Sequence, residues 1–272
     1  MKRKLQTILQ NLVAWIFSAI IVVPIIIIAL NSFKNVRESN SMDFHLPSVW
    51  EFSNYLDVIK RGNLLIGFRN SFSYALISTL ILLAVTLPCA FVLQRRASRL
   101  YRILYYVLII GIALPLNNIA LMKVMVGLHL MNTRTGIYLL YAAIGLPLSV
   151  FIAHGFMSGI PRELDEAAVI DGCSSGKLFL KVILPLLKPV ASTLFILNFL
   201  NTWNDFTMAI YFLNGSDKMP VTLSVYNFFG QYQKSWNLVC ADIMLTALPV
   251  LLVYLFAQKY IIQGLTSGAV KG

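Results

Sequence analysis

The chain has 272 residues, of which 58% are hydrophobic and only 12% are charged. Its mean hydropathy is +0.75, and a typical soluble domain carries about twice this share of charged residues. The composition excludes a disordered chain and argues against a water-soluble globule, because too few polar side chains exist to cover so apolar a core. Three cysteines, an odd number, also argue against a disulfide framework. The composition therefore predicts an all-α membrane protein with several spans.

Six apolar stretches are long enough for a transmembrane helix, which needs roughly 20 residues. These predicted spans cover residues 12–30, 71–93, 103–122, 136–157, 190–213 and 244–262. No soluble segment of domain size is left over, so residues 1–272 are expected to form a single transmembrane domain in the lipid bilayer. A cleavable signal peptide is the alternative for the first stretch, but its apolar run is too long and no small-residue cleavage site follows it.

Basic residues indicate how the chain is oriented in the membrane. They precede the first span and fill the short loop between the second and third spans: Lys2, Arg3, Lys4, Arg95, Arg96, Arg99 and Arg102. Cytoplasmic loops are enriched in Lys and Arg, so this loop is expected inside, and six spans then place both termini in the cytoplasm. The net charge of +11 is attributed to the Lys and Arg residues that orient the chain in the membrane. Nucleic acid is not an expected partner, because no basic face with interleaved aromatic residues is present.

The loop between the fourth and fifth spans, residues 160–185, predicts two short helices separated by a glycine turn. Pro161 suits the first turn of a helix, where its missing N–H costs nothing. The acidic residues that follow lie near the positive end of the helix, where they are favoured. Gly172 suits a left-handed stop, and Ser174 or Ser175 can cap the second helix.

The chemistry of the first of these helices favours a protein partner over a lipid surface. Leu164, Ala167 and Ala168 are expected to share one face. The alanines allow a partner to approach the backbone closely, and Glu166 offers a charge to a basic groove. An interfacial helix pair is the alternative, although an acidic helix suits anionic lipid poorly.

The same loop resembles the EAA motif of ABC-importer permeases, E-A-A-x3-G-x9-I-x-L-P. Here the motif reads Glu166-Ala167-Ala168, Gly172 and Val182-Ile183-Leu184-Pro185, with Val182 in place of the usual Ile. Further similarity lies in Arg69-Asn70-Ser71, in residues 132–136, in Trp203-Asn204-Asp205-Phe206 and in the tail from Gly264. The chain resembles the smaller, six-span permease subunit of carbohydrate importers of the maltose and multiple-sugar type.

This resemblance implies a set of partners in the bacterial cytoplasmic (inner) membrane. Two related permease subunits form a heterodimer around one pathway, a separate ATPase dimer binds below it, and an extracytoplasmic binding protein delivers the sugar substrate. The chain itself is then a non-catalytic subunit with no cofactor. The residues that would couple to the ATPase are Glu166, Ala167, Ala168, Gly172, Leu164 and Asp171. The C-terminal tail, residues 263–272, would reach the ATPase dimer through Gly264, Thr266, Gly268 and Lys271.

The fifth span carries the candidate residues for the translocation pathway. Asp205 lies deep in this span, and an intramembrane acid is a functional candidate by default. Asn198, Asn201 and Asn204 recur every three residues, which places their amides along one stripe of the helix. Trp203 could stack on a sugar ring. Contact with sugar and packing between subunits are both open for Asn201, Trp203, Asn204 and Asp205.

Other chemistries find little support in the sequence. A P-loop is not present, because Gly172 and Gly176 are one residue too close and Leu178 follows Lys177. The histidines are dispersed, so no metal site is expected. A secondary transporter or channel would need ionisable residues deep in several spans, and a membrane-embedded enzyme would need clustered His, Asp or Ser. A permease for a non-sugar solute stays open, since the EAA loop is shared across importers.

Overall fold

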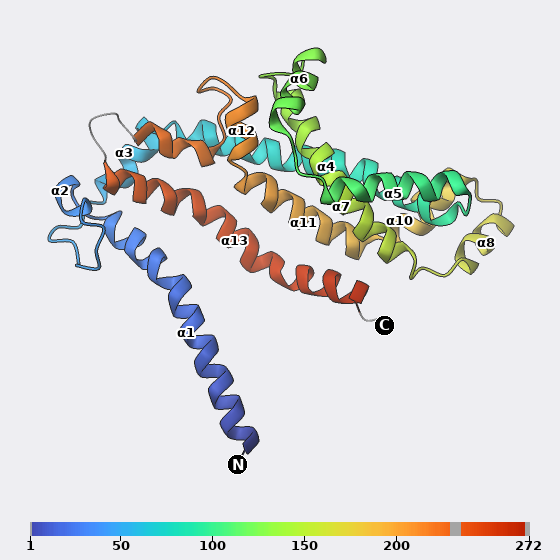
Figure 1. Cartoon of the computed structure of the whole chain (residues 1–272), viewed down its shortest axis with the longest axis horizontal. Coiled ribbons are helices and arrows are strands. Elements are labelled where there is room, and N and C mark those ends of the chain that lie inside the picture. The colour runs from blue at the N-terminus through green and yellow to red at the C-terminus, as the bar shows by residue number, and fades with distance from the viewer. Residues whose placement is uncertain (1, 229–234, 270–272) are drawn as a thin grey trace. The chain divides into compact units, whose positions relative to one another are not determined.

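The computed structural model describes residues 2–228 and 235–269, with side chains for 6–228 and 235–255. The described residues form helices and connecting loops, with no strand among them (Figure 1). The chain divides into two compact units. One comprises Met1–Gly67 and Leu223–Pro249, and the other comprises Phe68–Thr222 and Val250–Gly272. The all-α membrane fold expected from the sequence is confirmed.

Four helices in the described part are long and apolar enough to cross a membrane. They are α1 (Lys2–Asn31), α4 (Leu64–Arg95), α7 (Arg134–Met157) and α13 (Trp236–Ala269). They contain the first, second, fourth and sixth predicted spans. Each helix includes one proline without being ended by it, which membrane helices tolerate.

The third predicted span, residues 103–122, is not one continuous helix. It is divided into α5 (Arg99–Ala113) and α6 (Asn118–Gly127). Leu114 is extended, with ψ 127°, as expected for a residue before proline, because the ring of Pro115 disfavours the helical region there. The side chain of Asn117 then caps α6 by accepting from the Ala120 N–H at 3.0 Å.

The fifth predicted span, residues 190–213, is also interrupted. It comprises α11 (Lys188–Asn204) and α12 (Thr207–Phe212), and Asp205 between them is extended, with ψ 135°. Before α11, the chain forms α9 (Ser175–Lys177), the π-helical segment η1 (Leu178–Ile183) and α10 (Leu184–Leu186). This run meets α11 at a bend of 73°, next to Pro189, whose ring cannot continue a straight helix.

The unit that contains α1 has a small aromatic and polar core around α2 (Val36–Ser39) and α3 (Ser53–Arg61). The ring of Phe33 lies 5.1–5.2 Å from three other aromatic rings. The 3₁₀ helix η2 (Val221–Phe228) precedes α13. Residues 6–26 of α1 are all exposed, so this apolar surface needs lipid or another subunit to cover it.

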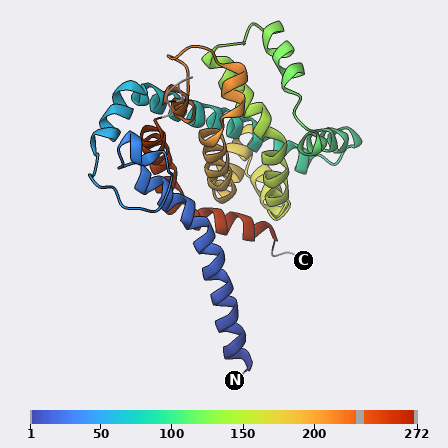
Figure 2. The same ribbon diagram turned by 60° about the vertical axis from the view of Figure 1, so that its left-hand side comes forward.

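The other unit holds both candidate sites. In it α7 contacts both α5 and α11, as Figure 1 and Figure 2 show. Buried side chains from α4, α7, the loop after α7, η1 and α11 form one apolar cluster. Its most buried members, all at 0% exposure, are Ala90, Ala153, Met157, Ile183 and Leu187. The loop after α7 is therefore packed into the same core as the long helices.

Candidate functional site

The loop after α7 forms the acidic helix that the sequence predicts. This helix, α8, runs from Glu163 to Ile170 and carries its acidic side chains in the first turn. They lie where the positive end of the helix dipole favours them. Pro161 precedes the helix and does not form part of its first turn, because the first carbonyl that accepts a helical hydrogen bond is that of Arg162.

Gly172 ends this helix as predicted. Its φ is +79°, in the left-handed region that favours glycine. The N–H of Gly172 donates to the Val169 carbonyl at 3.0 Å, and the N–H of Cys173 donates to the Ala168 carbonyl at 2.9 Å. This pair of bonds is the Schellman arrangement, which satisfies carbonyls at the helix end. The turn then leads to Ser174 at the start of α9.

One face of α8 is open. Glu163, Glu166, Ala167 and Ile170 are all exposed, and their spacing of i, i+3, i+4 and i+7 puts them on a single face. Ile170 is 85% exposed, the highest value among the large apolar side chains that the structure describes. We call these four residues the open face of α8.

The opposite face of α8 is packed inward. Ala168 is 7% exposed and belongs to the apolar cluster, whereas Leu164 is 41% exposed. Leu164, Ala167 and Ala168 keep the spacing i, i+3 and i+4 within the helix, but only Ala168 is buried, while Leu164 and Ala167 are exposed. Asp171, the residue after the helix, is exposed.

Arg95, the last residue of α4, holds the start of α8. Its Nε lies 2.6 Å from Asp165 Oδ2, and its Nη2 donates to Asp165 Oδ1 at 3.2 Å. Both Nη atoms donate to the Ile160 carbonyl at 3.2 Å. Only 11% of the Arg95 side chain and 17% of the Asp165 side chain are exposed. Arg162 in turn donates to the Gln94 carbonyl at 3.2 Å, so the end of α4 and the start of α8 are fixed together.

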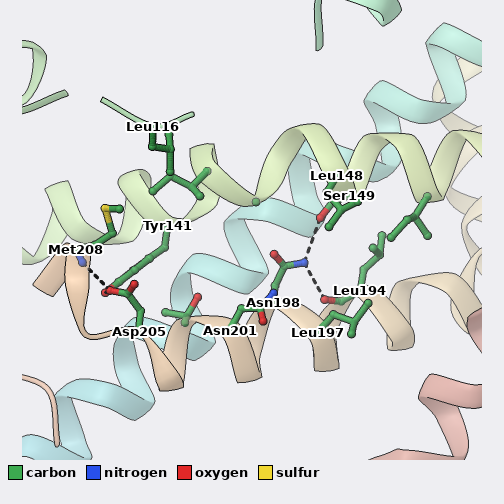
Figure 3. Close-up of a pocket in the computed structure, with 14 residues that line it drawn as sticks. Leu116, Tyr141, Leu148, Ser149, Leu194, Leu197, Asn198, Asn201, Asp205 and Met208 are labelled. Atoms are coloured by element: carbon green, nitrogen blue, oxygen red, sulfur yellow. Dashed lines mark hydrogen bonds between the residues drawn. The ribbon is translucent and has the colours of Figure 1, made fainter. Parts of the chain in front are cut away.

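A second candidate site is a cavity of about 340 Å³ between α7 and α11 (Figure 3). Its polar lining comes from Tyr141 and Ser149 on α7, and from Asn198, Asn201, Thr202 and Asp205 on or just after α11. Its apolar lining consists of Leu116, Ile144, Leu148, Ile152, Leu194, Leu197 and Met208. Gly145 completes the lining, and no cationic side chain is among these residues.

Asp205 connects three segments at one end of this cavity. Its Oδ1 accepts from the Tyr141 hydroxyl and from the Met208 N–H, both at 2.9 Å (Figure 3). The second of these bonds satisfies a free N–H in the first turn of α12. The Thr222 hydroxyl donates to the Asp205 carbonyl at 2.9 Å. The acid is thus placed by α7 and α12 as well as by its own helix.

Asn198 joins α7 to α11 in the middle of the cavity wall. Its Nδ2 donates to Ser149 Oγ at 3.1 Å and to the Leu194 carbonyl at 2.9 Å (Figure 3). A Cβ at Gly145 would lie only 2.4 Å from Asn198 Oδ1. Glycine at this position therefore allows the close approach of the two helices.

The structure brings together only part of the residue set predicted for the pathway. Asn201 and Asp205 line the cavity, but Trp203 and Asn204 do not. Trp203 is 5% exposed, and its ring lies 6.0–6.2 Å from the rings of Phe199 and Phe68. Asn204 is exposed.

In the predicted tail, Gly264, Thr266 and Gly268 lie within α13. The side chain of Thr266 and the whole of Lys271 lie outside the part of the chain that the structure describes.

The sequence did not single out Tyr141, Ser149 or the Arg95–Asp165 pair. Tyr141 and Ser149 stand in an apolar helix where nothing marks them as cavity residues. The sequence marks Arg95 only as an orientation signal, and its partner is 70 residues away in the sequence. The cavity and the Arg95–Asp165 pair each form only when segments that are distant in the sequence pack against one another.

Comparisons with known proteins fit this arrangement. Residues 64–267 match the family described as binding-protein-dependent transport system inner membrane component. The chain is 32% identical to the probable starch degradation products transport system permease protein AmyC of Thermoanaerobacterium thermosulfurigenes, over 99% of each chain. It is 34% identical to the melibiose/raffinose/stachyose import permease protein MelC of Bacillus subtilis, over 92% of this chain and 91% of the relative.

A solved structure shares the fold. A chain of a bacterial ABC transporter involved in the import of the acidic polysaccharide alginate matches with a TM-score of 0.84. The identity is 22%, and the match covers 94% of this chain and 96% of the other. The chain therefore belongs to the family of binding-protein-dependent transport system inner membrane components, and is an inner-membrane permease subunit of the ABC-importer type, as its EAA motif predicts.

Proposed function

We propose that the chain is one of two permease subunits of an ATP-driven importer for a sugar or oligosaccharide. The named cargoes of its relatives, which are starch degradation products and melibiose, raffinose and stachyose, support a carbohydrate. The partners are a second permease subunit, a separate ATPase dimer and an extracytoplasmic sugar-binding protein. Both termini of the chain and α8 face the cytoplasm.

The open face of α8 carries this proposal. It presents two carboxylates, an alanine and an almost fully exposed isoleucine. The helix that carries them is itself fixed to α4 by Arg95. Large apolar side chains with charged neighbours are typical of the centre and rim of protein interfaces. A groove with an apolar floor and basic edges on the ATPase would match this face.

The anchoring of α8 explains how a movement of the ATPase reaches the membrane helices. Arg95 fixes the start of α8 to α4, and Ala168 fixes its inner face to the cluster shared with α7 and α11. Displacement of α8 therefore displaces packed helices, because close-packed interiors transmit a shift. Coupling requires that the two states of the ATPase contact α8 differently.

The cavity between α7 and α11 is assigned to the translocation pathway, with Asn201 and Asp205 on its wall. Trp203 and Asn204 lie outside the cavity lining and are assigned to packing and to the exposed helix surface. The end of α13, with Gly264, Thr266 and Gly268, is assigned to contact with the ATPase dimer, together with Lys271.

Co-purification with the ATPase tests the role of α8. Glu166→Ala and Ile170→Ser are expected to reduce both the ATPase recovered with the permease and sugar-stimulated ATP hydrolysis in lipid. Lys177→Ala, an exposed site beyond the glycine turn, is the matched control and is expected to change neither. Normal association and hydrolysis in both α8 variants would contradict the proposal, as would sugar transport by the isolated chain.

A further inference from the structure

The cavity between α7 and α11 has a chemistry that specifies its ligand more closely than the family does. We propose that this subunit itself holds one neutral sugar ring in the cavity, bound by Asp205 and Asn201, and that Asp205 makes the site reject anionic sugars. This inference rests on the proposed function, because sugar is the cargo there.

The carboxylate of Asp205 is oriented with one oxygen free for a ligand. The two hydrogen bonds that the described residues make to this carboxylate both end on Oδ1, from the Tyr141 hydroxyl and the Met208 N–H. Two donors from different helices fix the plane of the group. Oδ2 is therefore available to accept from a hydroxyl, and a charge-assisted bond of this kind is stronger than a neutral one.

Asn201 supplies the complementary chemistry one helical turn away. Its side chain is exposed and lines the same cavity, and an amide offers both a donor and an acceptor. Sugar hydroxyls need both. Asn198 is already committed to Ser149 and to the Leu194 carbonyl, so we assign it to holding the wall and not to the ligand.

The remaining lining fits the body of a sugar ring. Its aliphatic side chains and the ring of Tyr141 offer apolar surface to the C–H groups of a pyranose. A volume of about 340 Å³ is at the lower end of the usual range for small-molecule sites, roughly 300–1,000 Å³. The site therefore suits one ring, and a longer saccharide would extend beyond it.

Charge decides which sugars this site accepts. Among the described residues that line the cavity, Asp205 is the only charged one. A uronate would place a second carboxylate beside Asp205 without a counter-ion, in surroundings where charges are poorly screened. Repulsion of this kind is a common source of specificity.

Direct binding to the importer complex tests the proposal. The complex of both permease subunits and the ATPase is held in lipid nanodiscs without the binding protein, so that only the membrane subunits can hold sugar. The probes are tritiated maltose, melibiose and raffinose, with digalacturonate as the anionic competitor. Asp205→Asn keeps the Oδ1 acceptor for Tyr141 and Met208 and replaces only Oδ2. Asn204→Ala, exposed and off the cavity, is the control.

We expect Asp205→Asn and Asn201→Ala each to weaken binding of the neutral sugar by about tenfold, the value of one good hydrogen bond. Asn204→Ala should bind the neutral sugar with an affinity within about twofold of the parent's. Digalacturonate should displace the neutral sugar poorly from the parent protein and more effectively from Asp205→Asn.

Equal neutral-sugar binding in all four proteins overturns the subsite while the proposed function stands. Loss of ATPase association in Asp205→Asn also overturns it, because Asp205 would then act through the fold. Failure of the complete importer to move any of the three neutral sugars with ATP overturns the proposed function, and the subsite with it.

Discussion

The contact between Arg95 and α8 gives a sharp prediction about how the coupling loop is held. In Arg95→Ala, Asp165 loses its cation and the Ile160 carbonyl loses both of its donors. The loop should then separate from the end of α4 much more often, while the long helices keep their own packing.

The size of this effect follows from the burial of the pair. Removing one partner of a buried ion pair costs roughly 3–5 kcal/mol. Since 17% of the Asp165 side chain is exposed, solvent recovers part of the loss, and we take the lower end, about 3 kcal/mol. This free energy raises the equilibrium constant for opening of the loop about 150-fold.

Hydrogen exchange measured by mass spectrometry on the permease in nanodiscs checks this. Protection of the α8 amides should fall by about two orders of magnitude, with little change in the middle of α7. Arg95→Lys should show a partial loss, because an ammonium cannot bind both the carboxylate and the carbonyl in a fixed fork. Arg96→Ala, an exposed neighbour, is the control. Unchanged protection of α8 in Arg95→Ala, or an equal loss in Arg96→Ala, would refute the reasoning.

Four further predictions concern other parts of the chain. Gly172→Ala should lower stability by about 1 kcal/mol, since φ is +79°, and Gly172→Asn should lower it less; thermal unfolding measures both. Ala168→Leu should cost about 1–3 kcal/mol of unfolding free energy by overpacking the cluster. Gly145→Ala should reduce sugar uptake, because its Cβ collides with the facing amide of α11, and normal uptake would contradict this. Lys34, 2.6 Å from Asp43, holds the pKa of Asp43 well below its usual range; Asp43→Asn should therefore lower the melting temperature at pH 7, with the difference from the parent shrinking below about pH 4.

The features of this fold that sequence predicts well are local ones. The acidic start of α8 and its stop at Gly172 depend on residues within a few positions of one another, and both are confirmed. The break before Pro115 is local too, and its signal, a proline after Leu114, was present in the sequence. A count of apolar residues does not register this proline, because Leu114 and Leu116 on either side of it are both apolar.

The features that sequence missed depend on packing between distant segments. Asp205 looks like an acid buried within a span, yet it ends α11 and binds the first turn of α12. Ala167 and Ala168 are indistinguishable by composition, and only the position of the core decides that one is exposed and the other buried. The ring of Trp203 likewise lies against the rings of Phe68 and Phe199 and does not line the cavity.

The most direct test of the proposed coupling is a cross-link from the open face of α8. Ala167→Cys, made after the three native cysteines are replaced by serine, puts a thiol on that face. We predict that a short bifunctional reagent joins it to the ATPase subunit in the intact importer, with a yield that changes when ATP is added. A thiol that never joins the ATPase, or that an impermeant reagent labels from outside the cell, would contradict this role.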